Sequence, residues 1–129
     1  MKASEIFEVQ FRDVYNYRFS YGGQSGYFKG LESGKLTASK CTHCGFAWCP
    51  PRPICSKCYC SAEAIELTGE GEILTSIVLV APPPRLKHVK SPVASALVKL
   101  DGADTCIKTM VVSKTGVFAS GTRVKAKFM

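Results

Sequence analysis

The sequence predicts a mainly β protein in three parts: an N-terminal arm with a short helix (residues 1–38), a rubredoxin-like metal ribbon (39–63) and a small C-terminal barrel (64–129). Three observations predict it. Aromatic and polar residues alternate before the ribbon, six of the seven cysteines lie between Ser39 and Cys60, and β-branched runs with Gly and Pro breaks follow. A chain of 129 residues fits one domain, or a small domain with an appendage.

The arm is defined by aromatic residues that alternate with polar ones at Tyr15, Tyr17, Phe19 and Tyr21. This spacing is that of a strand or extended segment with one apolar face. One interpretation is that these side chains cover the domain's own core. We favour the other, a docking surface for a partner, because aromatic residues are enriched in the cores of interfaces.

A short helix is expected after the arm. Tyr27, Phe28 and Leu31 have helical spacing, and Ser25 is a candidate N-cap. Gly30 and Gly34 limit its length. Tyr27 and Phe28 extend the predicted docking surface.

The ribbon is predicted from two C-x2-C pairs, Cys41 with Cys44 and Cys55 with Cys58. Each pair can aim two thiolates at one metal, and the ten intervening residues can form a hairpin that brings the pairs together. This pattern indicates a structural Zn²⁺ site. Iron is the less favoured alternative. A closed four-cysteine site has no open position for catalysis, so we expect a clamp that supplies folding energy.

Three cysteines remain outside this set. Cys60 competes poorly with Cys58 as a ligand, Cys49 has no assigned role, and Cys106, in a strand-like run, is expected to pack in the core. Cysteine catalysis would require a nearby base, and His43 and His88 are the two candidates. We expect no such catalysis.

The C-terminal part is predicted to contain about five short strands. The run at 64–80 contains a Gly69/Gly71 break, residues 81–92 form a proline-rich loop, and "DGAD" at 101–104 joins two strands as a hairpin. A closing strand has Val124, Ala126 and Phe128 on one face. This pattern is typical of a small barrel.

Several function classes are disfavoured by the sequence. No apolar run approaches the roughly 20 residues that span a bilayer. The first 17 residues have no apolar core of a secretory signal, so we expect a cytoplasmic protein with reduced cysteines. No G-x-S-x-G motif, phosphate-binding glycine loop or acid–base carboxylate pair is present, and Asp101 and Asp104 are interpreted as turn formers.

Taken together, the C-x2-C-x10-C-x2-C ribbon, the "CPPRP" loop, "ELTGEGEILTSIVL" and "SGTRVKAKF" resemble one bacterial and archaeal family over residues 27–128. Its members, long labelled a domain of unknown function, join a zinc ribbon to a five-stranded OB-fold barrel. The "YFKGLESGKLTASKC" segment matches the family's short helix before the first cysteine. Two features depart from the family's pattern. Tyr59 stands where the family usually has glycine, and the aromatic arm before residue 25 is not part of the pattern.

The resemblance implies a non-catalytic subunit that scaffolds and stabilises a thiolase-fold acyl-CoA enzyme, and helps to cover the CoA ester. Such a chain is not an enzyme on its own but an accessory subunit of an acyl-CoA acyltransferase complex. Relatives pair with thiolases of aromatic-compound degradation, including benzoylsuccinyl-CoA cleavage, with sterol side-chain enzymes, or with hydroxymethylglutaryl-CoA synthesis. Two copies of each chain are expected in the hetero-oligomer.

A basic cluster, Arg85, Lys87 and Lys90, lies in the proline-rich loop. A solvated loop is the simpler interpretation. The alternative is that its charge attracts the phosphates of CoA at a subunit interface.

The alternative function is nucleic-acid binding, which the net charge of +7 and the ribbon-plus-OB pairing would suit. Single-strand binding by OB folds relies on aromatic platforms, and the barrel half offers only Phe118 and Phe128. We therefore favour the acyl-CoA subunit.

Overall fold

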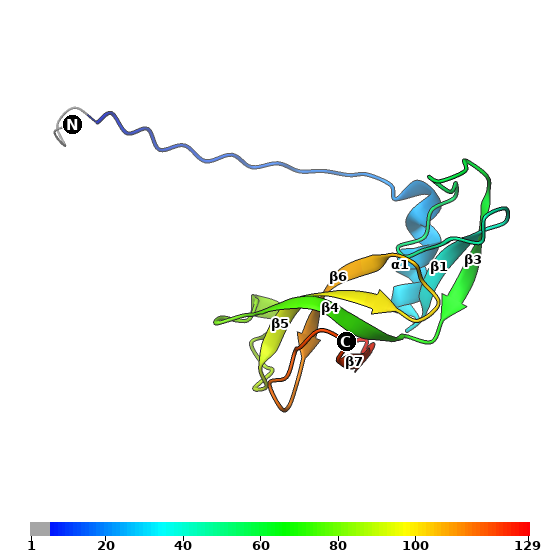
Figure 1. The fold of residues 1–129 in the computed structure, drawn as a ribbon. Coiled ribbons are helices and arrows are strands. Elements are labelled where there is room, and N and C mark those ends of the chain that lie inside the picture. The colour runs from blue at the N-terminus through cyan, green and yellow to red at the C-terminus, as the bar shows by residue number, and fades with distance from the viewer. Residues whose placement is uncertain (1–5) are drawn as a thin grey trace.

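The computed structural model describes residues 6–129, so the first five residues of the predicted arm lie outside the described part. Figure 1 shows an extended arm that leads into one short helix, followed by two β-sheets. The mainly β fold with an N-terminal helix is confirmed. No helix within residues 6–129 is both long enough and apolar enough to cross a bilayer.

Residues 6–21 of the arm have no regular secondary structure, and a 3₁₀ turn (η2, Gly22–Gln24) then leads into α1 (Ser25–Glu32). The predicted cap was wrong by one residue. Gln24 occupies the N-cap position without a side-chain hydrogen bond, and Ser25 is the first helical residue. The reason is that η2 runs directly into α1, so the backbone is already helical at the position where a cap residue would be extended.

The ribbon sheet has the strand order β2-β1-β3, with β1 at Leu36–Cys41, β2 at Ala47–Trp48 and β3 at Ala62–Leu67. Both pairings are antiparallel. The short β1–β2 hairpin turns at the first cysteine pair, so it is not the hairpin expected within residues 45–54 between the two pairs. It also places the first cysteine at the end of a strand that is paired on both sides.

The second sheet has the order β6-β5-β4-β7, with β4 at Glu70–Val78, β5 at Val93–Leu100, β6 at Cys106–Val112 and β7 at Arg123–Lys125. All of its pairings are antiparallel. The loop between β4 and β5 contains the 3₁₀ turn η3 (Pro84–Leu86). This sheet contains four of the about five strands expected, and the strand expected before the Gly69 break forms as part of β3 but pairs with β1 in the ribbon sheet.

The segment before β7 returns along β4 at a β-bulge. Ile73 donates its N–H to the Thr122 carbonyl at 3.0 Å and accepts the Gly121 N–H at 2.7 Å. The register of β4 on β5 shifts at this place, between Ile73 and Thr75. The bulge lets one strand bond to β5 on one side and to the returning segment on the other.

Gly71 is required by a close approach of two strands. A Cβ atom at this position would overlap the carbonyl oxygen of Lys99 on β5. Gly69 occupies a left-handed turn, with a φ of 81°, between β3 and β4. The predicted Gly69/Gly71 break is thus one turn followed by one tightly packed strand position.

One hydrophobic core is shared by the two sheets. Buried residues of the ribbon, including Leu36, Ala38 and Cys49, pack with Ile73 and Val98 of the second sheet. Tyr27 and Leu31 of α1 and Val124 and Ala126 near the C-terminus complete it. Phe128, expected on the same face as Val124, is 43% exposed beside Gly34, because β7 ends at Lys125 and does not hold it against the core.

Candidate metal centre

The first metal knuckle is the turn that follows β1. Cys41 donates its N–H to the Phe46 carbonyl at 2.9 Å and accepts the Gly45 N–H at 3.1 Å. Gly45 has a φ of 71°, the left-handed conformation that glycine adopts without steric cost. Within this turn the N–H groups of His43 and Cys44 point at Cys41 Sγ, at 3.4 and 3.5 Å, and stabilise a negative sulfur.

The second knuckle repeats this geometry between Cys55 and Cys60. Cys55 donates to the Cys60 carbonyl and accepts the Tyr59 N–H, both at 2.9 Å. Tyr59 takes the place of the turn glycine and has a φ of 59°. A non-glycine residue in this region destabilises the folded state by about 1–2 kcal/mol, so the surrounding fold must hold Tyr59 in this conformation.

The two knuckles bring four sulfurs together. The Sγ atoms of Cys41, Cys44, Cys55 and Cys58 all lie within 4.8 Å of one another. Sγ separations are 3.3 Å for Cys41–Cys58 and 3.7 Å for Cys44–Cys55. A tetrahedral zinc with Zn–S bonds of about 2.3 Å requires S···S distances of about 3.8 Å. The four cysteines therefore fit a four-sulfur metal site.

The acidities of the four thiols depend on one another. Desolvation raises the pKa of Cys55, but the N–H groups of Lys57 and Cys58 and the Trp48 indole overcome it and bring that pKa to about 6. The N–H of Cys60 lowers the pKa of Cys58, but the sulfurs of Cys41 and Cys44 and burial raise it to about 12. One thiolate thus forms easily and opposes the ionisation of its neighbours. A divalent cation is what allows all four to ionise.

Two aromatic rings between the cysteine pairs contact each other, and each has one cationic side chain over its face. The rings of Phe46 and Trp48 lie 4.7 Å apart, with Lys57 Nζ 4.3 Å from the Phe46 centroid and Arg52 Cζ 4.8 Å from the Trp48 centroid. Within residues 6–129, the buried Trp48 Nε1 has no partner at full hydrogen-bond geometry. Its N–H nevertheless lowers the pKa of Cys55, so it favours a thiolate at that sulfur. The two cations add positive charge close in sequence to the cysteine pairs, whereas Cys44 itself stays exposed.

The remaining cysteines have three different environments. Cys49 is buried, and desolvation raises its pKa to about 11. Cys60 is half-buried beside the second knuckle. The prediction that Cys106 packs in the core was wrong, because this thiol is exposed. The alternation of β6 turns Ile107 and Val111 toward the core and Cys106 away from it.

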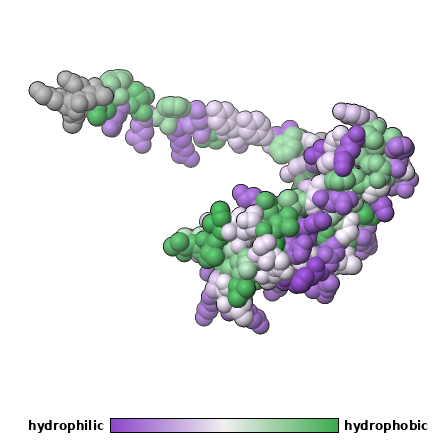
Figure 2. Space-filling view, viewed as in Figure 1, coloured by the Kyte–Doolittle hydropathy of each residue, from purple (hydrophilic) through white to green (hydrophobic). Residues whose placement is uncertain are grey.

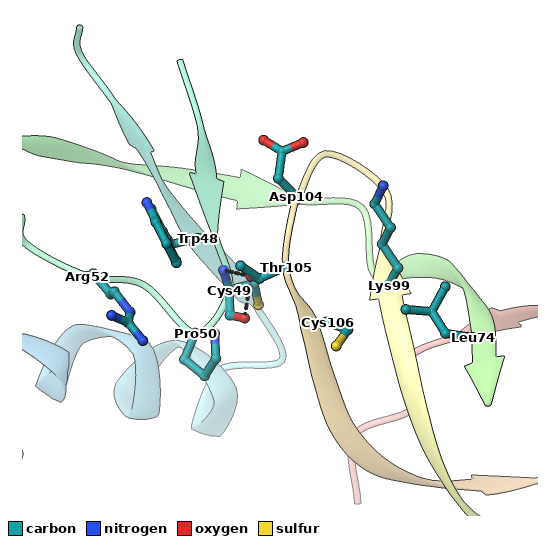
Figure 3. A pocket seen from close by; sticks show the side chains of 9 residues that line it. All are labelled: Trp48, Cys49, Pro50, Arg52, Leu74, Lys99, Asp104, Thr105 and Cys106. Carbon is teal, nitrogen blue, oxygen red and sulfur yellow. Dashed lines mark hydrogen bonds between the residues drawn. The ribbon is translucent and has the colours of Figure 1, made fainter. Parts of the chain in front are cut away.

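A shallow cavity of about 430 Å³ lies where the ribbon meets the second sheet (Figure 3). Its ribbon side is formed by Trp48, Cys49, Pro50 and Arg52, and its sheet side by Leu74, Lys99 and residues 104–106. Asp104 accepts the Ala47 N–H through its carboxylate at 2.8 Å, which joins the two walls. Both Asp101 and Asp104 lie in the β5–β6 connection, as expected of turn residues.

The predicted docking residues fall into two groups. Tyr15, Tyr17, Phe19 and Tyr21 are exposed on the arm, which stands clear of the rest of the molecule (Figure 2). Tyr27 instead packs against the core, where burial and the nearby Cys49 raise its pKa. Phe28, half-buried, joins the two groups, because its ring centroid lies 4.0 Å from Tyr21 and 5.3 Å from Tyr27.

Sequence reasoning missed two features. The alternation of the arm begins earlier than Tyr15, since Phe7, Val9 and Phe11 are also exposed at odd positions. The exposed His43 ring lies beside Cys60, because the two knuckles face each other. The first could have been found by extending the period-2 count toward the N-terminus, whereas the second depends on tertiary structure.

The basic loop carries exposed side chains around one buried anchor. Leu86 is buried, whereas Arg85, Lys87 and Lys90 are exposed.

Phe118, one of the two aromatic residues considered for base stacking, is buried in the core. It therefore offers no platform for a nucleic acid.

Comparison with known proteins places this geometry in a family. The model of the ChsH2 rubredoxin-like zinc ribbon domain matches residues 28–62. A DUF35 domain-containing scaffold protein of Methanocaldococcus jannaschii is 32% identical over 96 residues, which cover 72% of this chain and 67% of the relative. The chain belongs to the DUF35 family. The predicted resemblance is thereby confirmed.

Two solved structures share the DUF35 fold with this chain. One is a DUF35-family protein of unknown function from Sulfolobus solfataricus, with a TM-score of 0.55, 23% identity, and coverage of 69% of this chain and 68% of its own. The other is an Ltp2–ChsH2(DUF35) aldolase, with a TM-score of 0.61, 23% identity, and coverage of 88% and 85%. At this identity, the likeness supports the fold.

Proposed function

We propose that this DUF35 chain is a non-catalytic subunit that scaffolds and stabilises a thiolase-type acyl-CoA enzyme. Two relatives support the assignment: the M. jannaschii protein is described as a scaffold protein, and the Ltp2–ChsH2(DUF35) aldolase names a DUF35 component together with a second one. The thiolase-fold partner would carry the catalytic groups. A thiolase of aromatic-compound degradation, such as one that cleaves benzoylsuccinyl-CoA, is one partner of this class.

The observation that carries the proposal is the exposed arm. Phe7 is 90% exposed and Tyr17 is 78% exposed, on a segment that leaves the body of the protein as an extended chain (Figure 1). Contiguous apolar surface of this kind marks an interaction site on a soluble protein. The arm's apolar side chains would become buried when it lies along the partner.

The contact surface continues from the arm onto the body. Phe19 and Tyr21 pack edge to face at 5.4 Å, and Tyr21 contacts Phe28 on α1. These ring contacts connect the end of the arm to α1. A partner that covers the arm would thus also contact the outer face of the helix.

The metal in this proposal is a structural Zn²⁺ held by Cys41, Cys44, Cys55 and Cys58, with iron as the alternative. Bound there, zinc would supply folding energy rather than chemistry, because four protein ligands leave no open position. The ribbon would thereby keep α1 and the start of the arm in a fixed orientation for the partner. The boundaries of this ribbon at 39 and 63 remain part of the proposal.

The loop with Arg85, Lys87 and Lys90 is proposed to attract the CoA phosphates at the shared interface. Its three cations are exposed and sit on a loop anchored by Leu86, so they can approach an anion without unfolding the sheet. A cationic loop raises the local concentration of a negatively charged ligand.

Co-expression with a thiolase-fold subunit tests the proposed function. We expect one hetero-oligomer with two copies of each chain on size-exclusion chromatography with light scattering, and poor solubility or self-association of this chain alone. A partner that is fully stable and active alone, and never co-elutes with this chain, would contradict the proposal. Tight retention of single-stranded RNA or DNA at moderate salt would instead favour the nucleic-acid alternative.

A further inference from the structure

A second group of metal-binding side chains lies on the outer side of the four-cysteine centre. A His43 ring nitrogen and the Sγ atoms of Cys58 and Cys60 all lie within 4.8 Å of one another. His43 is exposed, and Cys58 and Cys60 are half-buried. Solvent can thus reach this group, unlike the buried sulfurs of Cys41 and Cys55.

Backbone contacts hold His43 and Cys60 together. Thr42, which precedes His43, donates its N–H and its hydroxyl to the Ser61 carbonyl, at 3.1 and 3.0 Å. The Cys60 carbonyl accepts the Cys55 N–H, so Cys60 is part of the second knuckle. The two knuckles are therefore hydrogen-bonded to each other at Thr42 and Ser61, the residues next to His43 and Cys60. These bonds hold the two side chains close together.

Charge and ligand chemistry favour a cation at this place. A divalent ion on four thiolates leaves two net negative charges, and a metal-bound thiolate such as Cys58 keeps lone pairs that can bind a second ion. Lys57, the nearest cation in sequence, is held over the Phe46 ring. Imidazole and thiolate together are typical ligands of Zn²⁺ and of softer ions of the same charge.

We propose that His43, Cys58 and Cys60 bind a second divalent, thiophilic cation such as Zn²⁺ or Cd²⁺, with Cys58 Sγ bridging the two ions. The proposal rests on the four-cysteine centre being loaded and goes beyond the scaffold role. Three protein ligands leave one position open to water or to a small thiol. The second ion therefore binds more weakly than the first and exchanges first with a chelator.

The test loads the full chain with excess ¹¹³Cd²⁺ and combines native mass spectrometry with ¹¹³Cd NMR. We expect two bound ions and two resonances, coupled to each other through the shared sulfur. His43→Ala and Cys60→Ser should each leave one ion, whereas the control Cys106→Ser, which alters an exposed thiol far along the sequence, should leave two.

Three outcomes would overturn the second site. The first is a single ion and a single resonance in the unaltered chain. The second is that His43→Ala and Cys60→Ser both retain two ions. The third is that both variants lose every ion, which would assign these residues to the first site. A chain that binds no ion at all would instead contradict the four-cysteine centre itself. The number of bound ions therefore tells whether the second site or the four-cysteine centre has failed.

Discussion

The Thr105 hydroxyl accepts the Cys49 N–H and donates to the Cys49 carbonyl, with both donor–acceptor distances at 2.8 Å. One side chain just before β6 thus satisfies both backbone groups of a buried residue in the ribbon. Asp104 reinforces the junction, because its N–H bonds to the Ala47 carbonyl at 2.9 Å. The metal ribbon and the second sheet are joined by these contacts as well as by their common core.

Thr105→Val should destabilise the protein by about 1–3 kcal/mol, because it leaves a buried N–H and a buried carbonyl of Cys49 without partners. Valine has nearly the same shape and a strong preference for strands, so packing and propensity change little. Denaturant unfolding of the metal-loaded protein measures the change. Thr109→Val on β6 is the control and should change stability by less than about 0.5 kcal/mol. Equal stability of the two variants would refute the junction.

Metal removal should unfold the ribbon and expose Trp48, the single tryptophan of the chain. The sulfurs would then lose the cation that allows all four to ionise, and metal binding supplies much of the folding energy of such small segments. Tryptophan fluorescence should shift to the red on chelation and recover when Zn²⁺ is returned. Folded protein that contains neither zinc nor iron on elemental analysis would contradict this account.

Tyr59→Gly should stabilise the loaded protein by about 0.5–1 kcal/mol, because glycine adopts a positive φ at little cost, although the unfolded chain also gains freedom. The tyrosine ring is 83% exposed, so its removal costs little packing. Tyr59→Ala separates the two effects, since it removes the ring but keeps the steric conflict. The thermal midpoint should rise for glycine and not for alanine, and a rise of equal size in both would show that the backbone is not the cause.

Arg85→Ala/Lys87→Ala should raise the KM for acyl-CoA of the assembled complex by several fold while leaving assembly intact, if the loop attracts CoA phosphates. The effect should shrink with added salt, because exposed charges are screened. Lys108→Ala/Lys114→Ala removes the same charge elsewhere and is the control. An unchanged KM would dismiss the CoA role of the loop without affecting the scaffold role.

Much of this fold was predictable because its strongest determinants are local. The C-x2-C spacing encodes each knuckle, and Gly45 fits the turn that the first one needs. The Thr105–Cys49 contact and the approach of His43 to Cys60 were not predictable, because each joins segments whose relative position is set by tertiary packing. The exposure of Cys106 depended on which face of β6 turns inward, and an apolar run does not reveal this.

The arm's role is tested most directly by the affinity of the chain for the proposed thiolase-fold partner. Replacing Tyr15, Tyr17, Phe19 and Tyr21 by serine should weaken that affinity by at least about 100-fold, since buried aromatic residues dominate interface energies. The free chain's thermal midpoint should change little, because Tyr15, Tyr17 and Phe19 are largely exposed in it and Tyr21 contacts only neighbouring rings. Arg12→Ser/Asn16→Ser/Arg18→Ser alters the alternate positions of the same arm and should keep near-normal affinity. Unaltered binding by the aromatic variant, measured by calorimetry beside this control, would contradict the account, whereas selective loss of binding by the aromatic variant is the result it predicts.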